Sequence, residues 1–306
     1  MRAPAAPHRL QRIGVYLRAM FPLHINAPMA ILVFVSGYVT SAIVRGEAIR
    51  LDARAAYGVL TVFLMALLLR VFDELKDRAA DAQLFAERPL VTGAVKYSDI
   101  HILGAIVAAA AVTLNLGRGA ASPAFAVLFA YTLFTWRWCF VPRMSEYPEV
   151  VLLTHQPLVA LIFYYIYCVY VDVTGGVPAI REGMVVALVM WPPLFAWEIA
   201  RKVRAPAQET DYLTYSKRWG PRVAAGVVVV TFLTGAALTA IVGAIYGLSR
   251  FVPVYYGLVA LGSSAVIIRF VVAPSPRRNR LRPVAELFVV LYYLGPLLDR
   301  LLATRL

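Results

Sequence analysis

The sequence predicts an all-α, polytopic membrane protein with about nine transmembrane helices in one bundle. Of its 306 residues, 61% are hydrophobic and only 15% are charged, a composition well outside the range of soluble proteins. The apolar residues form continuous runs rich in Ala, Leu and Val, whereas a membrane β-barrel would alternate apolar and polar residues. A helical span needs ~20 mainly apolar residues. The stretches of about that length are 22–44, 56–77, 98–116, 122–140, 148–171, 182–201, 222–247, 252–273 and 284–304.

These stretches differ in what flanks and interrupts them. The first follows a basic arm and is long enough to stay in the membrane, so it predicts a span rather than a cleavable signal peptide. The second and the sixth each run into a charged segment. The fourth and fifth contain Cys139 and Cys168, which predict core packing and neither a disulfide nor a soft-metal site. No low-complexity linker divides the chain, so residues 1–306 are predicted to form a single domain.

The net charge of +13 is distributed unevenly between the two sides of the predicted bundle. Leaving aside the intramembrane Arg70 and Arg269, the N-terminal arm and the loops after even-numbered spans carry 20 Lys and Arg, against 8 on the other side. The arm contributes Arg2, Arg9, Arg12 and Arg18. This positive-inside asymmetry places the arm and those loops in the cytoplasm and predicts a bacterial-type inner membrane protein. The basic excess therefore reflects topology, with anionic lipid or a phosphorylated substrate as partner, and does not indicate nucleic acid.

The second stretch ends in the acidic run Asp73-Glu74-Leu-Lys-Asp77-Arg-Ala-Ala-Asp81. A spacing of four places its three aspartates on one stripe of a helix, where like charges repel. A cation must offset them, and oxygen ligands without His or Cys indicate a hard ion such as Mg²⁺. The alternative is an ordinary solvated helix end with interleaved basic residues.

A second charged cluster follows the sixth stretch, on the same predicted face. Its acids are Glu198, Glu209 and Asp211, and its bases are Arg201, Lys202 and Arg204. Alone, this mixture is typical of a salt-bridged rim. Together with the first cluster it predicts a diphosphate site, in which carboxylates hold a metal and the bases bind non-bridging oxygens.

The first cluster resembles the Asn-Asp-x-x-Asp-x-x-x-Asp motif of the UbiA superfamily of intramembrane prenyltransferases, which have nine helices. Asp73 stands in place of Asn and Glu74 in place of the first Asp. Three further segments are similar to the family pattern: Arg18-x-x-x-Pro22, Arg88-Pro89-Leu90 and Thr214-Tyr-Ser216-Lys-Arg-Trp-Gly220. The second motif departs from the family's three Asp positions, which are occupied here by Glu198, Ala205 and Glu209.

The resemblance implies an Mg²⁺-dependent enzyme that moves an isoprenyl group from a prenyl diphosphate to a lipophilic, aromatic acceptor. The implied catalytic residues are Asp73, Asp77, Asp81, Glu198 and Glu209, and the implied metal ligands are the same five with Glu74 added. The implied diphosphate-binding residues are Arg18, Arg88, Arg201, Lys202 and Arg204. Candidates for an acceptor or cation pocket are His24, Asn26, His155 and Tyr164. The missing Asp at Ala205 suggests that one metal is held differently or is replaced by Lys202 or Arg204.

Other functions remain open from the sequence alone. A UbiA-type terpene cyclase would ionise the same diphosphate and quench the cation within its own chain. A membrane carrier would use intramembrane carboxylates, although carriers usually place them near the bilayer midplane and these cluster at one face. A nonenzymatic scaffold would explain a degenerate second motif.

Overall fold

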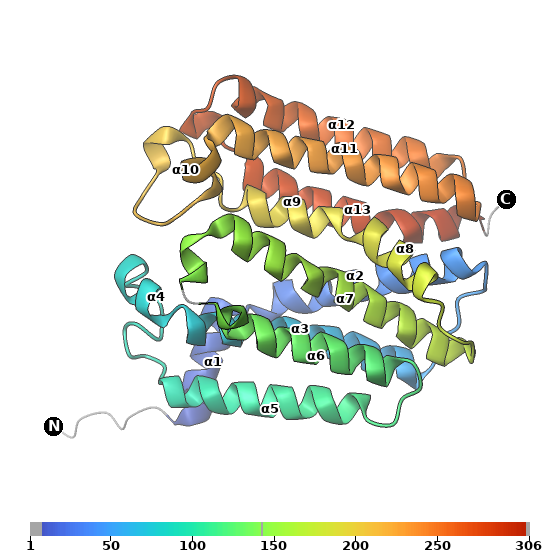
Figure 1. Ribbon diagram of the computed structural model, residues 1–306, viewed down its shortest axis with the longest axis horizontal. Helices are drawn as coiled ribbons and strands as arrows, with labels where there is room; N and C mark the ends of the chain where they lie inside the picture. Colours follow the sequence, from blue (N-terminus) through green and yellow to red (C-terminus); the bar gives the residue numbers. More distant parts are fainter. Residues whose placement is uncertain (1–7, 142, 304–306) are drawn as a thin grey trace.

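The computed structural model describes residues 8–141 and 143–303 as an elongated all-helical bundle (Figure 1). Arg2 of the predicted basic arm and residue 304 at the end of the predicted ninth span lie outside the described residues. The helices that build the bundle are α2 (Leu23–Arg45), α3 (Ala53–Lys76), α5 (Tyr97–Asn115), α6 (Ala121–Trp136), α7 (Pro148–Thr174), α8 (Ile180–Met190), α9 (Pro192–Ala200), α11 (Pro221–Tyr246), α12 (Phe251–Val272) and α13 (Leu281–Ala303). The short helices and 3₁₀ turns are α1 (Arg9–Met20), α4 (Arg78–Leu84), η1 (Trp138–Phe140), η2 (Met144–Glu146), η3 (Pro206–Gln208), α10 (Tyr215–Trp219) and η4 (Pro276–Arg278).

The predicted all-α membrane bundle is confirmed. Over the described residues, eight segments are long and apolar enough to cross a membrane, with α8 and α9 together forming one of them. The predicted stretch that is missing from these eight is the fourth, 122–140, which corresponds to α6, a helix of only 16 residues. It ends at Trp136, four residues earlier than predicted, because the backbone at Trp138, Cys139 and Phe140 adopts left-handed φ values that a right-handed helix excludes.

The sixth predicted span, 182–201, is not a continuous helix. It breaks at Trp191, between α8 and α9. Pro192 and Pro193 carry no N–H, so the helical hydrogen bonds that they would donate are missing. The hydroxyl groups of Tyr292 and Tyr293 on α13 instead donate to the carbonyls of Val189 and Met190, at 2.8 and 2.9 Å.

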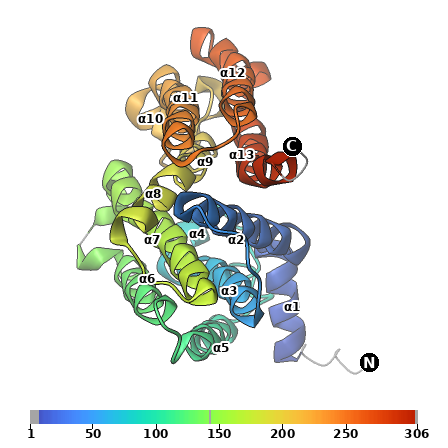
Figure 2. The same ribbon diagram turned by 90° about the vertical axis from the view of Figure 1, so that its right-hand side faces the viewer.

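The bundle has two parts, which are clearest when the molecule is viewed end on (Figure 2). One part contains α3, α5, α6 and α7, and the other contains α9, α11, α12 and α13. Helix α2 lies between them and packs on α7 and α3 on one side and on α13 and α8 on the other. Gly58 allows α2 and α3 to approach closely, since a Cβ there would lie 2.5 Å from the ring of Phe34.

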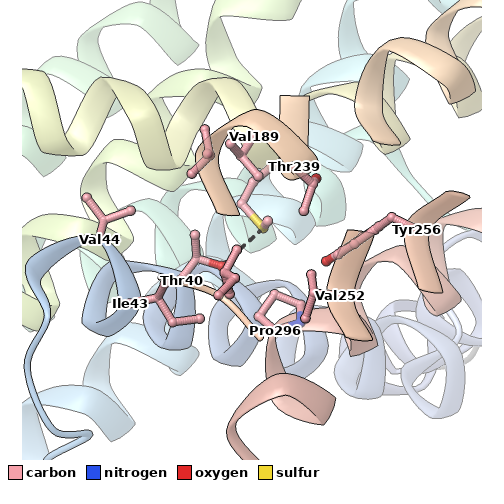
Figure 3. Close-up of a pocket in the computed structure, with 11 residues that line it drawn as sticks. Thr40, Ile43, Val44, Val189, Thr239, Val252, Tyr256 and Pro296 are labelled. Atoms are coloured by element: carbon pink, nitrogen blue, oxygen red, sulfur yellow. Dashed lines mark hydrogen bonds between the residues drawn. The ribbon is translucent and has the colours of Figure 1, made fainter. Parts of the chain in front are cut away.

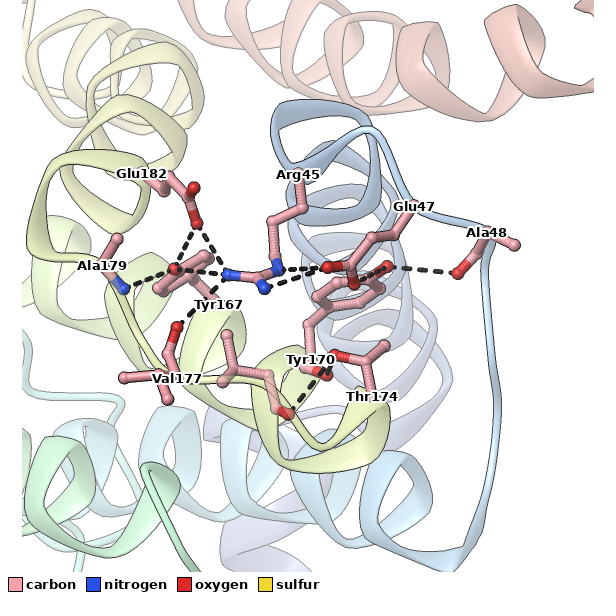
Figure 4. Close-up of polar contacts among 10 residues, drawn as sticks. Arg45, Glu47, Ala48, Tyr167, Tyr170, Thr174, Val177, Ala179 and Glu182 are labelled. Carbon is pink, nitrogen blue, oxygen red and sulfur yellow. Dashed lines mark hydrogen bonds and ion pairs between the residues drawn. The ribbon is translucent and has the colours of Figure 1, made fainter.

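A polar network closes the end of the bundle at which α2 finishes (Figure 4). Arg45 is paired with Glu47 at 2.9 Å and with Glu182 at 2.8 Å, which ties the α2–α3 loop to α8. Tyr167 donates to Glu182 at 2.7 Å, and Tyr170 donates to Glu47 at 3.2 Å. We call this set of five residues the far-end network. It is remote from both acidic clusters, because α3 and α9 carry those at the opposite end.

The interior between the two parts is tightly packed. A void of about 20 Å³ lies where α2, α8, α11, α12 and α13 meet, lined by Thr40, Val189, Thr239, Tyr256 and their apolar neighbours (Figure 3). This volume is close to that of a single water probe. The void is therefore a packing defect and does not accommodate a substrate.

Candidate active site

Both acidic clusters lie at the same end of the bundle. Helix α4 contains the end of the first cluster, α10 follows the second cluster, and Figure 1 places both helices at one end of the molecule. The segment after α4 touches the segment between α9 and α10, where Phe85 and Tyr212 pack edge to face with ring centroids 5.8 Å apart. We call this end the carboxylate end, and the structure agrees with the prediction that the clusters share a face.

The first cluster does not form one helical stripe. Helix α3 ends at Lys76, and Asp77 adopts the bridge-like angles φ −93° and ψ 8° before α4 begins. Asp73 is therefore on α3, Asp77 is at the junction, and Asp81 is on α4. The three carboxylates therefore come from two helices and the junction between them, and not from one stripe of a single helix.

Two acids of the first cluster are buried and engaged by arginines. The side chain of Glu74 is 2% exposed, and it pairs with Arg70 on the same helix and lies 3.8 Å from Arg88. Asp81, also buried, pairs with the same Arg88. These contacts hold the α4 segment and the Arg88-Pro89 turn against the end of α3. Each of these two carboxylates therefore has an arginine partner, which it contacts through one of its two oxygens.

The other two acids of the cluster are more accessible. The Asp73 side chain is 46% exposed and pairs with Lys76 at 2.9 Å. Asp77 forms no ion pair with any of the residues that the structure describes. Partial burial raises the pKa of Asp77 to about 6, and the neighbouring charges of Asp73 and Asp81 add to this rise, while Lys76 and Lys202 oppose it.

The second cluster faces this pair with positive charge. Glu198, on the last turn of α9, accepts from Arg201 at 2.6 Å and pairs with Lys202 at 2.9 Å. Arg201 lies close enough to Asp73, and Lys202 to Asp77, for each pair to interact electrostatically. The carboxylate of Glu198 neutralises only part of their combined charge. The remaining positive charge is suited to binding an anion.

The other residues of the second motif make hydrogen bonds within the loop that follows α9. Arg204 turns its guanidinium to the carbonyls of Arg201 and Val203, at 3.0 and 3.2 Å. Glu209 accepts from the Thr214 hydroxyl at 2.9 Å. Ala205 is fully buried and supplies no ligand. Of the implied diphosphate-binding residues after α9, the structure brings Arg201 and Lys202 to the site, and directs Arg204 to the backbone.

The candidates for an acceptor or cation pocket are dispersed. His155 on α7 lies in the site, with its Nε2 3.3 Å from Lys76 Nζ. Asn26 donates to the carbonyl of Pro22 at 3.0 Å, and His24 is exposed at the start of α2. Tyr164 is nine residues beyond His155 on α7, about 13 Å deeper at 1.5 Å per residue, and it packs against Gly183. Arg18 is exposed on α1 and forms no ion pair with a described carboxylate.

Lys76 is the residue that the sequence analysis passed over. It was interpreted only as a charge that interrupts an acidic run, yet it contacts Asp73, His155 and the ring of Trp138, whose centroid is 4.7 Å from Nζ. Its position three residues after Asp73 is the signal that could have identified it, because residues so spaced are neighbours on a helix.

The arrangement suits a magnesium ion bound jointly by protein and substrate. Among the described residues, no three His, Cys, Asp or Glu side chains gather closely enough to hold a metal alone. Asp73 and Asp77 offer two carboxylates, and Mg²⁺ typically binds one or two carboxylates and takes its other ligands from water and phosphate. The oxygen-only donors fit a hard cation, and the bases opposite fit the phosphate.

Comparison with known proteins identifies the family of this chain. Residues 30–291 match the sequence profile of the UbiA prenyltransferase family. No curated protein matches the sequence directly. The fold is similar to the apo structure of a UbiA homologue from Aeropyrum pernix K1, with a TM-score of 0.65 at 16% identity over 89% of this chain and 98% of that one.

Two further solved structures share the fold. One, described as a digeranylgeranylglyceryl phosphate synthase, has a TM-score of 0.64 at 12% identity and covers 94% of this chain and 99% of its own. The other is a UbiA homologue from Archaeoglobus fulgidus bound to DMAPP and Mg²⁺, with a TM-score of 0.50 at 13% identity over 90% of this chain and 98% of that one.

Proposed function

Because this chain belongs to the UbiA prenyltransferase family, we propose that it transfers an isoprenyl group from a prenyl diphosphate to a lipophilic, aromatic acceptor, with Mg²⁺ bound at Asp73 and Asp77. The observation that carries the proposal is the arrangement of the carboxylate end. Two accessible carboxylates on α3 and its junction face Arg201 and Lys202 across one site. A metal-bound diphosphate fits between such groups, since it needs carboxylates on one side and cations on the other.

The diphosphate is held from the side of the second cluster. Arg201 and Lys202 retain positive charge beyond what Glu198 neutralises, and they bind the non-bridging oxygens. Glu198 orients both bases, since it contacts each of them. In this proposal Glu198 is a positioning residue and not a metal ligand. Glu209 shapes the loop through Thr214, and Glu74 and Asp81 anchor Arg88.

The reaction proceeds by cleavage of the allylic C–O bond. When bound, Mg²⁺ supplies charge that stabilises the departing diphosphate. Arg201 and Lys202 stabilise the same leaving group from the other side as negative charge develops on it. The prenyl tail lies in the apolar part of the bundle, where water is excluded and the allylic cation survives until the acceptor carbon attacks. The acceptor then loses a proton, for which His155 is the nearest candidate base beside Lys76.

The family and its relatives support the donor class. The Archaeoglobus fulgidus structures are bound to DMAPP or GPP with Mg²⁺, and we infer a donor of the same kind here. The proposed orientation has the carboxylate end in the cytoplasm of a bacterial-type cell, since the loops at that end carry most of the Lys and Arg. The position of the acids at one end of the spans also disfavours a carrier, whose site would lie near the midplane.

The proposal is tested by incubating the purified full-length protein with Mg²⁺ and geranyl, farnesyl or geranylgeranyl diphosphate, with and without a pool of quinone-type aromatic acids. Release of diphosphate and the masses of the products are measured. We expect diphosphate release that depends on the acceptor pool, together with a prenylated aromatic product. Release with only a cyclic hydrocarbon would replace the proposal with a terpene cyclase, and absence of release with every donor would refute it.

A further inference from the structure

A charged cavity lies beside the first cluster, with Lys76 as one of its lining residues. Its volume is about 330 Å³, and it lies where the ends of α3, α5 and α6 meet. The lining residues are Leu75, Lys76, Arg78, Tyr97, His101, Trp136, Arg137 and Trp138. We call it the basic–aromatic cavity. The proposed transfer reaction uses none of these residues apart from the contact of Lys76 with Asp73.

The cavity is built to hold an anion. Each of three cations lies over an aromatic ring: Lys76 over Trp138 at 4.7 Å, Arg78 over Tyr97 at 4.0 Å and Arg137 over Trp136 at 5.1 Å. No acidic side chain lines the cavity, and neither Arg78 nor Arg137 has an ion-pair partner among the described residues. The ring contacts orient the cations without neutralising them.

The position of the cavity indicates what kind of anion it holds. Helix α3 ends at Lys76, α5 begins at Tyr97 and α6 ends at Trp136, so the cavity is at the level where three spans leave the membrane. Trp and Tyr are typical of this interfacial level. Along α5 and α6, toward the membrane interior, Ile106, Leu133 and Phe134 are exposed by 60%, 38% and 40%. Charge at the rim and an apolar surface below it match a lipid with an anionic headgroup.

We propose that the basic–aromatic cavity binds the phosphate headgroup of an acidic phospholipid, whose acyl chains lie on the exposed apolar faces of α5 and α6. Arg78 and Arg137 contact the phosphate, and the neighbouring rings occupy the headgroup region. The lipid also draws Lys76 toward the cavity and away from Asp73, which frees that carboxylate for its metal. This second consequence rests on the proposed prenyl transfer, whereas lipid binding itself does not.

The test measures lipid binding directly. Delipidated full-length protein is titrated with phosphatidylglycerol or phosphatidylcholine, and bound lipid is counted by native mass spectrometry. The double variant R78A/R137A is compared with R277A/R278A, which removes two exposed arginines of η4 from the same end of the bundle. At about fivefold in affinity per basic residue near the membrane surface, R78A/R137A should bind phosphatidylglycerol about 30-fold more weakly, with R277A/R278A within about threefold of the wild type.

Two further arms make the result decisive. The charge-preserving R78K/R137K variant should retain most of the affinity for phosphatidylglycerol. The melting temperatures of R78K/R137K and R78A/R137A are measured to check that both variants are folded. Glycerol phosphate, which has the charge but no acyl chains, should not displace bound phosphatidylglycerol at equal concentration. Unchanged phosphatidylglycerol affinity in R78A/R137A, equal binding of phosphatidylcholine, or displacement by glycerol phosphate would each overturn the proposal.

Turnover is a separate readout. Phosphatidylglycerol should increase diphosphate release by the wild type about threefold and leave R78A/R137A unchanged, because only the wild type binds the lipid that moves Lys76. If the protein releases no diphosphate under any condition, the proposed prenyl transfer fails while the lipid titration still decides the cavity. Lipid binding without stimulation overturns the coupling through Lys76.

Discussion

The carboxylate end has two corners, one formed by the first acidic cluster and the Arg88-Pro89 turn and the other by the second cluster. Their sequences are ordered alike, but their charged groups are paired differently. Each begins where a span ends, with an acid on the last helical turn, and continues through basic residues into a loop that contains a proline. At the first corner Arg70 and Arg88 are paired with Glu74 and Asp81, whereas Asp73 and Asp77 form no ion pair with an arginine that the structure describes. At the second, Glu198 is shared by two bases and Ala205 provides no carboxylate. The difference supports the proposal that the first corner binds the cation and the second binds the anion.

The strongest test of this division is removal of the accessible carboxylates. Asp73→Ala and Asp77→Ala should each reduce diphosphate release by about 10³-fold or more, because the leaving group loses the charge stabilisation that Mg²⁺ supplies. Both variants should stay folded, since neither residue is fully buried. Turnover and the circular dichroism melting curve are measured together. Retained activity in both variants would remove the metal site from the first corner.

The second corner is tested by changing the balance of its charges. Lys202→Ala should lower kcat/KM by about 100-fold, the effect typical of losing one group that stabilises transition-state charge. Ala205→Asp restores the carboxylate of the family pattern and should make the Mg²⁺ dependence steeper, as expected for a second ion. The two variants are compared by titrating Mg²⁺ at fixed donor concentration. Unchanged metal affinity and turnover in both would show that the second corner does not replace a metal with a base.

The pH dependence sharpens the comparison, because the first corner contains a carboxyl group, that of Asp77, whose pKa is raised toward neutrality. Burial raises the pKa of Asp77 to about 6, so at limiting Mg²⁺ turnover should fall as the pH drops through about 6, where the carboxylate becomes protonated and loses affinity for the cation. In Lys202→Ala the midpoint should move upward, since Lys202 holds this pKa down. A midpoint that stays in place in this variant would contradict the electrostatic link between the corners.

The smallest effect on catalysis is expected at Glu74, although it occupies a motif position. Glu74→Gln leaves Arg70 and Arg88 without their shared buried carboxylate, which should destabilise the fold by about 2 kcal/mol. Its activity should fall less than tenfold. Glu182→Gln in the far-end network is a matched control, because it also weakens an arginine pair but lies at the opposite end. A loss in Glu74→Gln as large as that in Asp73→Asn would make Glu74 a metal ligand after all.

The sequence predicted the bundle well, because the composition of a membrane span depends on the bilayer and little on neighbouring helices. It also predicted that both clusters share one end, because the number of Lys and Arg residues in each loop indicates on which side of the membrane that loop lies. It did not reveal which carboxylates are accessible. The turn at Asp77 and the engagement of Asp81 by Arg88 depend on how α4 folds back, and four-residue spacing alone gives no sign of that turn. The role of Lys76 likewise depends on Trp138 and His155, which come from other helices.

The break at Trp191 bears on the order in which the chain assembles. The carbonyls of Val189 and Met190 accept from Tyr292 and Tyr293, which are synthesised about a hundred residues later. Until α13 inserts, these two carbonyls lie in a hydrocarbon environment without a donor, a state that costs several kcal/mol per group. A chain truncated before α13 is thus an unstable intermediate that exposes polar backbone to lipid. Insertion of α13 therefore completes the sixth span, because it supplies the donors that the break at Trp191 leaves missing.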